Sequence, residues 1–358
     1  MRGSSQTDRR SEEAQLLEAL ESGDFAALHS LQVKSAVSPR PKPAQTFFSQ
    51  LEELLVGPES LLPMKETQPV IEACKTRLSN FVIPQSSFKI GKMIESREQD
   101  SVFEGEYAKN RVFIRRIFVR VDPKQLIAAL QELLILSRLR HDNVILLLGV
   151  ALDEQLNLCV VTERYSQFSL NELIKNNDKL SFQTKLKITF QVARTLMYFH
   201  SLSPRILFRN VVPGSFRVDG EGNIKIVDFG SAREMNCLTE KSEIQKIDFS
   251  SNSTLEYLSP ETLSRSSYLS ESDVYSFGVL MFSIFTGREF SHKKGQSLVT
   301  SILIERYRPE LDSTTLPAEL KALIQSCWAN ENKKRPSFEE ICERLNEAGL
   351  AGDRGASK

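Results

Sequence analysis

The stretch at 205–234, RILFRNVVPGSFRVDGEGNIKIVDFGSARE, carries side chains suited to phosphate chemistry. Asp228, in the triplet Asp-Phe-Gly, supplies a carboxylate that can bind a metal ion. Arg209 supplies a guanidinium that can hold a phosphate through two hydrogen bonds. Asn210 follows directly, and its amide has no usable basicity, so it cannot accept a proton from a substrate hydroxyl. This stretch therefore has a possible metal ligand in its Asp-Phe-Gly triplet, the intact motif, whereas the Phe-Arg-Asn triplet at 208–210, the damaged motif, has no group that could act as a base.

The overall composition is that of a globular protein without a charge bias. The chain has 358 residues, of which 41% are hydrophobic and 26% are charged, so it can bury one large core beside an extension. Lysine plus arginine and aspartate plus glutamate both number 46, which gives a formal net charge of zero. No broad field therefore attracts the chain to nucleic acid or to an anionic membrane, and no basic aromatic platform supports nucleic-acid binding.

Cysteine spacing and hydropathy bear on the compartment. The five cysteines are scattered, without a C-x-x-C pair or histidines at metal-ligand spacing: Cys74, Cys159, Cys237, Cys327 and Cys342. This pattern is typical of free thiols in a reducing compartment, and it argues against a zinc site or disulfides. No secretory h-region and no apolar run of about 18 residues or more is present, so we expect no membrane span. The default is a cytosolic or nuclear protein, and we predict a cytoplasmic location.

The organisation of the chain changes near residue 85. Amphipathic patterns predict two short helices within 12–32 and further helices at 45–56 and 67–81, with an extended Pro- and Lys-rich linker at 34–45. We interpret residues 1–85 as a helical extension that packs on the main domain. Residues 86–348 then form that domain, and 349–358 form a flexible tail.

From residue 86 onward, strand patterns give way to helical patterns. Four runs alternate with period two, at 86–94, 101–108, 111–121 and 156–165. A helix with apolar residues at i, i+3, i+4 and i+7 is predicted between them, at 123–141. Five further helices are predicted, at 169–177, 181–202, 270–287, 316–332 and 337–349. We expect a small lobe with a sheet and one helix, followed by a larger helical lobe.

Five short motifs in this part of the chain occur in a characteristic order. They are LSRLRHDNVILLLG at 136–149, VDFG at 227–230, YLSPE at 257–261, SDVYSFGVL at 272–280 and CWANENKKRPSFEEI at 327–341. Together they resemble the protein-kinase fold, most closely the tyrosine-kinase-like branch of serine/threonine kinases, over residues from about 87 to 347. The resemblance implies an α+β, bilobal fold: a small antiparallel-sheet lobe with helix C and a larger helical lobe, here with an N-terminal helical extension.

The glycine-rich loop of the resembled family lets backbone N–H groups approach the ATP phosphates. Here the corresponding run is IGKMIESREQDSVFEG, in which Gly91 survives, later glycines are missing, and about four additional residues lengthen the hairpin. We expect Met93, Glu95 and Asp100 to crowd or repel a polyphosphate. A plain β-hairpin without a ligand role is the alternative interpretation.

The next strand of the family reads V-A-I-K, and here it reads Val-Phe-Ile-Arg at 112–115. Phe113 and Arg115 alternate onto one face, so the ring is expected to occupy adenine space and the guanidinium to replace the ammonium of the family's lysine. Glu132 matches the helix C glutamate and can pair with Arg115. Thr162 matches the gatekeeper position and 163–165 the hinge.

The family pattern H-R-D-L-K-x-x-N supplies a catalytic base, a lysine for the transferring phosphoryl group and an asparagine for the second Mg²⁺. At those positions this chain has Asn210, Val212 and Ser215. Valine carries no charge, and a serine hydroxyl is a poorer and shorter metal ligand than the amide. Asp228 remains as a magnesium ligand, although its motif can also serve packing and backbone capping.

Other matched residues are predicted to be architectural. The resemblance pairs Glu261 with Arg335, places Asp273 beneath the backbone of the catalytic loop, and puts Trp328 in the core. Arg209 matches the arginine that often receives a phosphate from the activation segment. Six hydroxyl residues of that segment are candidates for phosphorylation: Thr239, Ser242, Ser250, Ser251, Ser253 and Thr254. The alternative is that Arg209 only packs and hydrogen-bonds within its loop.

Two functions follow from the resemblance. The first is a pseudokinase that acts as a signalling scaffold or conformational switch through contacts with other proteins, an active kinase among the candidates. The second is an atypical serine/threonine kinase that transfers the γ-phosphate of ATP to protein hydroxyls. ATP and Mg²⁺ are the cofactors that the resemblance implies, but the site residues depart from the family pattern, and the sequence leaves open whether a pseudokinase would bind them.

Overall fold

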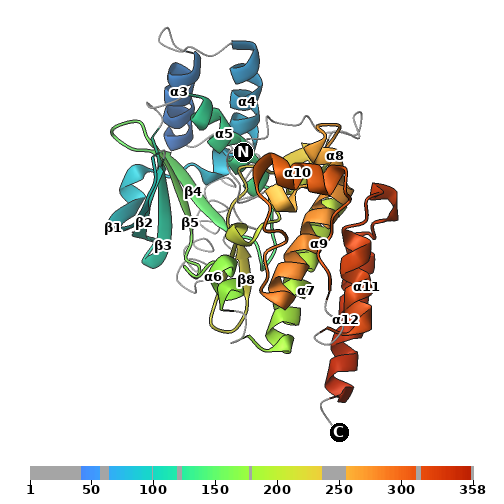
Figure 1. Ribbon diagram of the computed structural model, residues 1–358. Coiled ribbons are helices and arrows are strands. Elements are labelled where there is room, and N and C mark those ends of the chain that lie inside the picture. Colours follow the sequence, from blue (N-terminus) through green and yellow to red (C-terminus); the bar gives the residue numbers. More distant parts are fainter. Residues whose placement is uncertain are drawn as a thin grey trace, which may run out of the picture. The chain divides into compact units, whose positions relative to one another are not determined.

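The structure, a computed structural model, describes residues 42–56, 64–98, 100–118, 123–176, 180–235, 255–311 and 316–355 (Figure 1). These residues fall into two compact units. The first holds the described residues up to 140 together with 145–164, and the second holds 141–144 and the described residues from 165 onward. The helices expected within 12–32 and the six hydroxyl residues of the activation segment lie outside the described residues.

A five-stranded antiparallel sheet forms the centre of the first unit. Its strand order is β1-β2-β3-β5-β4. The strands are β1 (Phe88–Ser96), β2 (Asp100–Tyr107), β3 (Asn110–Ile117), β4 (Leu147–Leu152) and β5 (Leu158–Glu163). The four predicted strands are thus confirmed. β4 was not predicted, because its sequence LLGVAL is an almost fully buried apolar run without alternation.

One helix follows β3, as predicted, but it is shorter than expected. α5 (Pro123–Leu136) ends five residues before the end of its apolar pattern. The N–H groups of Arg138 and Leu139 donate to carbonyls only three residues back, at 3.0 and 3.1 Å. This tighter hydrogen bonding closes the helix, while Leu139 beyond it stays buried in the turn.

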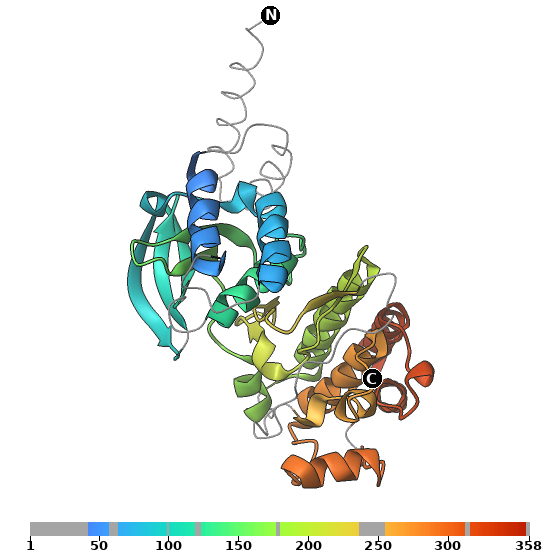
Figure 2. The same cartoon turned by 90° about the horizontal axis from the view of Figure 1, so that it is seen from above.

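Two N-terminal helices belong to the same unit as the sheet. α3 (Lys42–Val56) and α4 (Met64–Arg77) pack against each other, and α4 packs against α5, as Figures 1 and 2 both show. α3 buries Phe47, Leu51 and Leu55 along one side. The helices predicted at 45–56 and 67–81 are therefore present. The predicted linker is corrected at its end, because residues 42–45 form the first turn of α3, whose second residue is a proline.

The second unit is mainly helical. Its helices are α6 (Leu170–Lys175), α7 (Phe182–Ser201), α8 (Pro260–Leu263), α9 (Ser270–Thr286), α10 (Gly295–Leu303), α11 (Ala318–Cys327) and α12 (Phe338–Gly355). α9 is buried on every side over 272–285 and contacts α7 and α11. It ends at Gly287, whose φ of 68° is the left-handed conformation that glycine adopts without strain. α12 extends to Gly355, into the residues that were expected to form the tail at 349–358.

Two small antiparallel sheets hold the stretch at 205–235. β6 (Arg205–Leu207) pairs with β9 (Arg233–Met235), and β7 (Phe216–Val218) pairs with β8 (Ile224–Ile226). The loops between these short strands carry the Arg-Asn and Asp-Phe-Gly residues. Local strand pairing therefore fixes the backbone on both sides of the Arg-Asn and Asp-Phe-Gly residues.

The described helices and cysteines bear on two further expectations. Among the described residues, no helix combines the length and apolar character needed to cross a membrane. The described cysteines are free thiols, with Cys74, Cys159 and Cys327 buried and Cys342 partly exposed. Burial raises the pKa of the Cys74, Cys159 and Cys327 thiols to about 12, so these groups stay protonated and unreactive at neutral pH.

Candidate functional site

The predicted site residues are divided between the two units, and each group is described within its own unit. Gly91, Arg115, Glu132 and Thr162 lie in the first. The second unit contains Arg209, Asn210, Ser215 and Asp228.

In the first unit, the two faces of β3 carry side chains of different kinds. Val112 and Ile114 belong to a hydrophobic cluster that includes Phe88 and Val161. Because side chains alternate along a strand, Phe113 and Arg115 lie on the opposite face, as the sequence predicts. The face that would meet a nucleotide thus carries a ring and a guanidinium.

Arg115 is bound by two carboxylates. Its Nη1 donates to Glu132 Oε2 at 2.9 Å and to Oε1 at 3.1 Å, so the predicted pair with the helix residue is present. Its Nε donates to Asp100 Oδ2 at 2.6 Å. Burial alone would lower the pKa of Arg115, but the charges of Glu132 and Asp100 outweigh burial and raise it above its ordinary value.

Asp100 has a different role from the one expected. We predicted that its side chain would repel a polyphosphate from the hairpin, whereas it lies only 4% exposed at the start of β2 and holds Arg115. The three-residue cluster contains one positive and two negative charges. An additional anion would therefore meet a net negative charge, although Arg115 itself is cationic. Sequence spacing gives no signal for this contact, because the register of β2 and β3 depends on the turn between them.

Phe113 is 2% exposed and is the cross-strand neighbour of Thr162, which is 8% exposed. Residues directly opposite in adjacent strands share a face of the sheet. The ring therefore already fills space beside the gatekeeper position. This burial is consistent with the expected obstruction of an adenine ring.

Gly91 has a local structural reason to be glycine. A β-carbon there would lie 3.0 Å from the carbonyl oxygen of Glu104 on β2. The pairing of β1 with β2 shifts register between Ile90 and Met93, where Gly91 lies. Close approach of the two backbones at an irregularity explains the residue without a ligand.

In the second unit, the intact and damaged motifs meet. Asn210 Nδ2 donates to Asp228 Oδ2 at 3.0 Å, and the N–H of Gly230 donates to Asp228 Oδ1 at 3.3 Å. Asp228 is exposed and Asn210 is partly exposed. The residue at the catalytic-base position thus acts as a donor to the carboxylate that the resemblance assigns to Mg²⁺. The predicted backbone cap by Asp228 is also present.

Ser215 lies in a setting unlike that of a metal ligand. It is fully buried at the end of a short 3-10 turn, and its Oγ has no hydrogen-bond partner. Among the residues that the structure describes, no group of three or more His, Cys, Asp and Glu side chains could hold a metal ion. The metal site that the resemblance implies needs a second protein ligand beside Asp228, and the buried hydroxyl of Ser215 does not fit that role.

Aromatic packing accounts for the middle residue of the Asp-Phe-Gly triplet. Phe229 is fully buried, with ring centroids 5.6 Å from Phe208 and 5.9 Å from Phe199. Phe208 in turn lies 6.2 Å from Phe216. Tilted and edge-to-face contacts of this kind stabilise a core beyond the area they bury. The triplet therefore has a packing role inside the second unit.

A buried carboxylate anchors the loop that contains Arg209. Asp273 is fully buried and accepts from the N–H groups of Phe208 at 2.9 Å and Arg209 at 2.8 Å, as predicted for this residue. The Tyr268 hydroxyl also donates to it, at 2.7 Å. These bonds hold Arg209 at a φ of 64°, a left-handed conformation that a non-glycine residue rarely adopts.

The side chain of Arg209 packs over an aromatic ring. Its guanidinium carbon lies 5.1 Å from the centroid of Tyr268. Burial lowers the pKa of Arg209. It also lowers the pKa of Arg233, and the nearby charge of Arg209 adds to the effect. The packing role considered for Arg209 is thus present, and sequence reasoning missed both Tyr268 and Arg233 as its neighbours.

The second architectural pair is also present. Arg335 Nη1 donates to Glu261 Oε1 at 2.7 Å, and Nη2 donates to Oε2 at 2.9 Å. The Ser272 hydroxyl donates to the same carboxylate at 2.7 Å. Trp328 is buried against Phe282, which confirms its assignment to the core.

Comparison with known proteins gives a family match over most of the chain. The family described as protein tyrosine and serine/threonine kinase matches residues 88–345. A protein of Acanthamoeba polyphaga mimivirus, whose name describes it as a serine/threonine-protein kinase/receptor, is 30% identical over 75% of this chain. The serine/threonine-protein kinases CTR1 and STY17 of Arabidopsis thaliana are 28% and 26% identical, over 85% and 79% of it.

These relatives are much longer than this chain. The matched region covers 16% of the mimivirus protein, 37% of CTR1 and 49% of STY17.

Proposed function

The chain belongs to the protein tyrosine and serine/threonine kinase family, and we propose that it is a pseudokinase within it. In this proposal the chain works as a signalling scaffold or conformational switch through contacts with other proteins, of which an active kinase is one candidate. Phosphoryl transfer is lost or very weak. Catalysis in the family depends on positioned charges, so the proposal rests on which charges this chain retains.

The hydrogen bond from Asn210 to Asp228 carries the proposal. An amide that donates to a carboxylate directs its N–H group toward it and offers no lone pair of useful basicity for a substrate proton. It also uses one of the oxygens of the one carboxylate retained for Mg²⁺. A single contact therefore affects both the base and the metal ligand.

The charge cluster of the first unit supports the same proposal. Two carboxylates bind Arg115, so its guanidinium is engaged before any phosphate arrives. Phe113 is buried where the family has a small alanine. ATP and Mg²⁺, which the family uses generally, are therefore proposed to bind weakly or not at all.

An atypical serine/threonine kinase is the second candidate. The observations that favour it are the exposed side chain of Asp228 and the intact pair between Arg115 and Glu132. This candidate requires another group to replace the base at Asn210 and the lysine at Val212. We favour the pseudokinase for that reason.

The deciding experiment is a phosphate-transfer assay. The purified full chain is incubated with labelled Mg-ATP, alone and with generic protein substrates, beside the variant Asp228→Ala. We expect equal, background incorporation in both. Incorporation by the wild type that disappears in Asp228→Ala would reject the pseudokinase and establish the kinase alternative.

We further propose that the protein acts in the cytoplasm. The scattered cysteines support this, because the described ones are free thiols of the kind that a reducing compartment maintains. Fractionation of cells that express the full chain would test it, and recovery from the secreted or membrane fraction would reject it.

A further inference from the structure

The β1 edge of the five-stranded sheet has features that phosphate chemistry does not use. β1 is the first strand in the sheet order and pairs with β2 alone. No strand among the described residues pairs with its outer side. After Phe88, every residue of β1 is exposed. An edge of this length offers unpaired backbone donors and acceptors to another chain.

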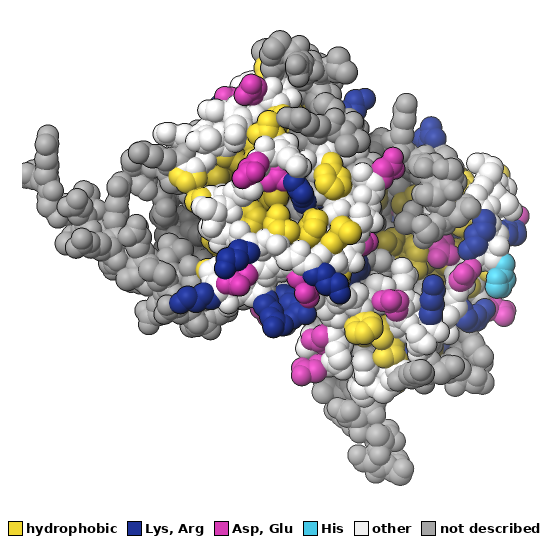
Figure 3. All heavy atoms as spheres, turned by 90° about the vertical axis from the view of Figure 1, so that its left-hand side faces the viewer, with side chains coloured by type: hydrophobic (Ala, Val, Ile, Leu, Met, Phe, Trp, Pro, Cys, Tyr) yellow, Lys and Arg dark blue, Asp and Glu magenta, His cyan; other side chains and the backbone are white. Residues whose placement is uncertain are grey.

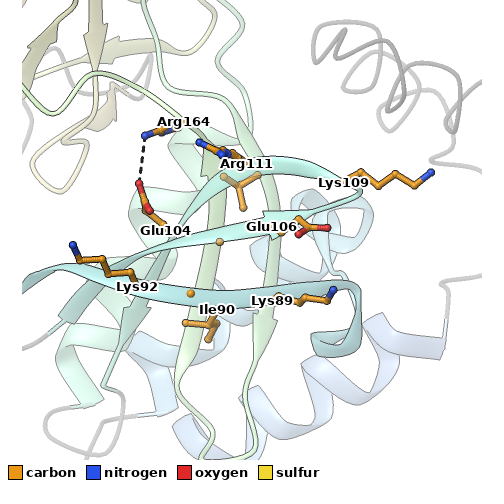
Figure 4. A pocket seen from close by; sticks show the side chains of 11 residues that line it. Lys89, Ile90, Lys92, Glu104, Glu106, Lys109, Arg111 and Arg164 are labelled. Atoms are coloured by element: carbon orange, nitrogen blue, oxygen red, sulfur yellow. Dashed lines mark hydrogen bonds and ion pairs between the residues drawn. The ribbon is translucent and has the colours of Figure 1, made fainter.

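A basic hollow lies beside this edge. Its volume is about 490 Å³, and its lining comes from β1, β2 and β3, from the turn between β2 and β3, and from Arg164, which follows β5. Lys89 and Lys92 lie on β1 (Figure 4). Glu104 and Glu106 lie on β2, between them and the basic side chains of Arg111 and Arg164. Of the positions that the resemblance assigns to the nucleotide site, Gly91 and the hinge residue Arg164 line it.

The charges of this lining do not balance. Glu104 pairs with Arg164 at 3.3 Å, and Glu106 lies opposite both Lys89 and Arg111 in the strand register. Two carboxylates can therefore neutralise only two of the four basic side chains of Lys89, Lys92, Arg111 and Arg164. Lys109, at the turn between β2 and β3, also belongs to the lining. The excess positive charge favours an acidic ligand.

Hydrophobic side chains accompany this charge. Ile90, Met93 and Ile94 of β1 are 39%, 51% and 37% exposed, and they are three of the five exposed large hydrophobic residues in the described part of the chain. Figure 3, which views the side where β1 to β3 are drawn, shows basic side chains gathered next to hydrophobic ones. A free phosphate compound would use only the charges. A peptide would use the charges, the apolar side chains and the strand edge together.

We propose that β1 and the basic hollow bind an extended acidic segment of a partner protein, which adds as a strand at the β1 edge. Acidic side chains of the segment lie over Lys89 and Lys92, and apolar ones contact Ile90. The register shift between Ile90 and Met93 interrupts regular pairing, so the partner strand gains few backbone hydrogen bonds and depends on the charges. Binding is therefore expected to weaken as salt is added.

This proposal goes beyond the function proposed above, because it holds whether or not the chain transfers phosphate. It states which kind of partner segment the β1 edge would bind. Its test measures peptide binding, and its result is independent of the phosphate-transfer assay.

The probe is a labelled peptide of about ten residues with alternating glutamate and valine, long enough to span β1. Its binding to the full chain is measured by fluorescence anisotropy at low and physiological salt. The variant combines Lys89→Glu with Lys92→Glu, and the matched control is Lys333→Glu, which reverses an exposed charge in the second unit. We expect binding to weaken by about tenfold or more in the double variant and to stay unchanged in the control.

Two further probes distinguish other occupants. A peptide with proline at alternate positions keeps its acidic residues but loses half of its backbone N–H donors and pairs poorly as a strand, so we expect it to bind more weakly. Equal binding of the proline peptide would overturn strand addition. Inorganic tripolyphosphate tests a phosphate site: tight binding of it through Lys89 and Lys92, without peptide binding, would overturn the proposal. Equal peptide affinity in wild type and double variant would overturn it as well.

Discussion

Arg115 makes hydrogen bonds that a lysine could not reproduce. Its Nε and Nη1 groups point to different carboxylates, those of Asp100 and Glu132, and an ammonium has no planar fork to reach both in this geometry. Asp100 is nearly buried, so a lost partner would leave its charge poorly solvated. The family's usual lysine is therefore expected to be the less stable residue at this position.

The variant Arg115→Lys tests this expectation. We predict that its free energy of unfolding falls by about 1–3 kcal/mol, because a charged hydrogen bond is lost while its partner stays buried. Urea denaturation of the full chain measures the change. Arg111→Lys, at an exposed position of the same strand, is the control and should behave like the wild type. Equal stability of Arg115→Lys would show that the second carboxylate contributes little.

Phe113 is the residue that we propose as the main barrier to an adenine ring. We predict that Phe113→Ala creates or strengthens nucleotide binding, at a cost of about 3–5 kcal/mol in stability because the ring is buried. Calorimetric titration with ATP measures the binding. Val112→Ala removes volume from the opposite face of β3 and should lose stability without gaining nucleotide. If Phe113→Ala stays folded and binds no better than wild type, the obstacle lies in the hairpin or at Arg115.

Single residues also mark the limit of prediction from sequence. The contacts of Glu132, Asp273 and Glu261 could be predicted, because the resembled motifs carry their partners with them. The contact of Asp100 could not, since it depends on strand register. The hydrogen bond between Asn210 and Asp228 joins residues 18 positions apart and becomes visible only when two short sheets fix both loops.

At the scale of elements, one ion pair joins three segments of the second unit. Arg335 binds Glu261 of α8 through two nitrogens and also donates to the carbonyl of Glu271 in α9 at 2.8 Å. Burial would raise the pKa of Glu261, but the hydrogen bonds and charge of Arg335 outweigh burial and lower it below its ordinary value. The folded state therefore favours the carboxylate form of Glu261.

The free energy of unfolding of the variant Glu261→Gln should be about 3–5 kcal/mol lower than that of the wild type at neutral pH, because Arg335 stays buried without its counter-charge. A lowered folded-state pKa means that the pair stabilises fully above pH 4.5, the ordinary value for this group, and less as pH falls through the folded value. The difference in free energy of unfolding between wild type and variant should thus become smaller in acid. Urea denaturation at neutral pH and in acid measures this difference, and Glu305→Gln, which changes an exposed ion-pair residue, is the control. A difference independent of pH would contradict the sign.

Helices and strands with a clear hydrophobic periodicity were predicted well, but the residues at which they begin and end were predicted less well. Within the described residues, the alternating strands and the predicted amphipathic helices appear where expected, while β4 lacks a hydrophobic period and was missed. The helix was predicted to reach residue 141, whereas α5 ends at Leu136 and a tight turn follows. The prediction was too long because a buried apolar residue can lie in a turn as well as in a helix. Proline at the start of α3 was interpreted as linker, although this residue is well tolerated in a first helical turn.

At the scale of the whole molecule, the retained and the changed residues differ in kind. Residues that hold the second unit together keep the contacts that the resemblance implies: the core of α9, the buried Asp273 and the pair between Glu261 and Arg335. The changed positions are those that would meet ATP, metal or substrate. The contacts that hold the fold are thus separate from the changed positions, which supports the binding function that we propose.

This separation predicts how the intact chain responds to ATP. A ligand that binds only the folded state raises the melting temperature, and at a concentration of 100 times its Kd it stabilises by about 2.7 kcal/mol. We predict that ATP, with or without Mg²⁺, leaves the melting temperature of the wild type unchanged, because Arg115 is held by two carboxylates and Phe113 is buried. A thermal-shift titration measures this, with Phe113→Ala as the variant expected to respond. A rise in the wild type that requires Mg²⁺ and vanishes in Asp228→Ala would show that this carboxylate still binds a metal–nucleotide complex, despite its hydrogen bond with Asn210.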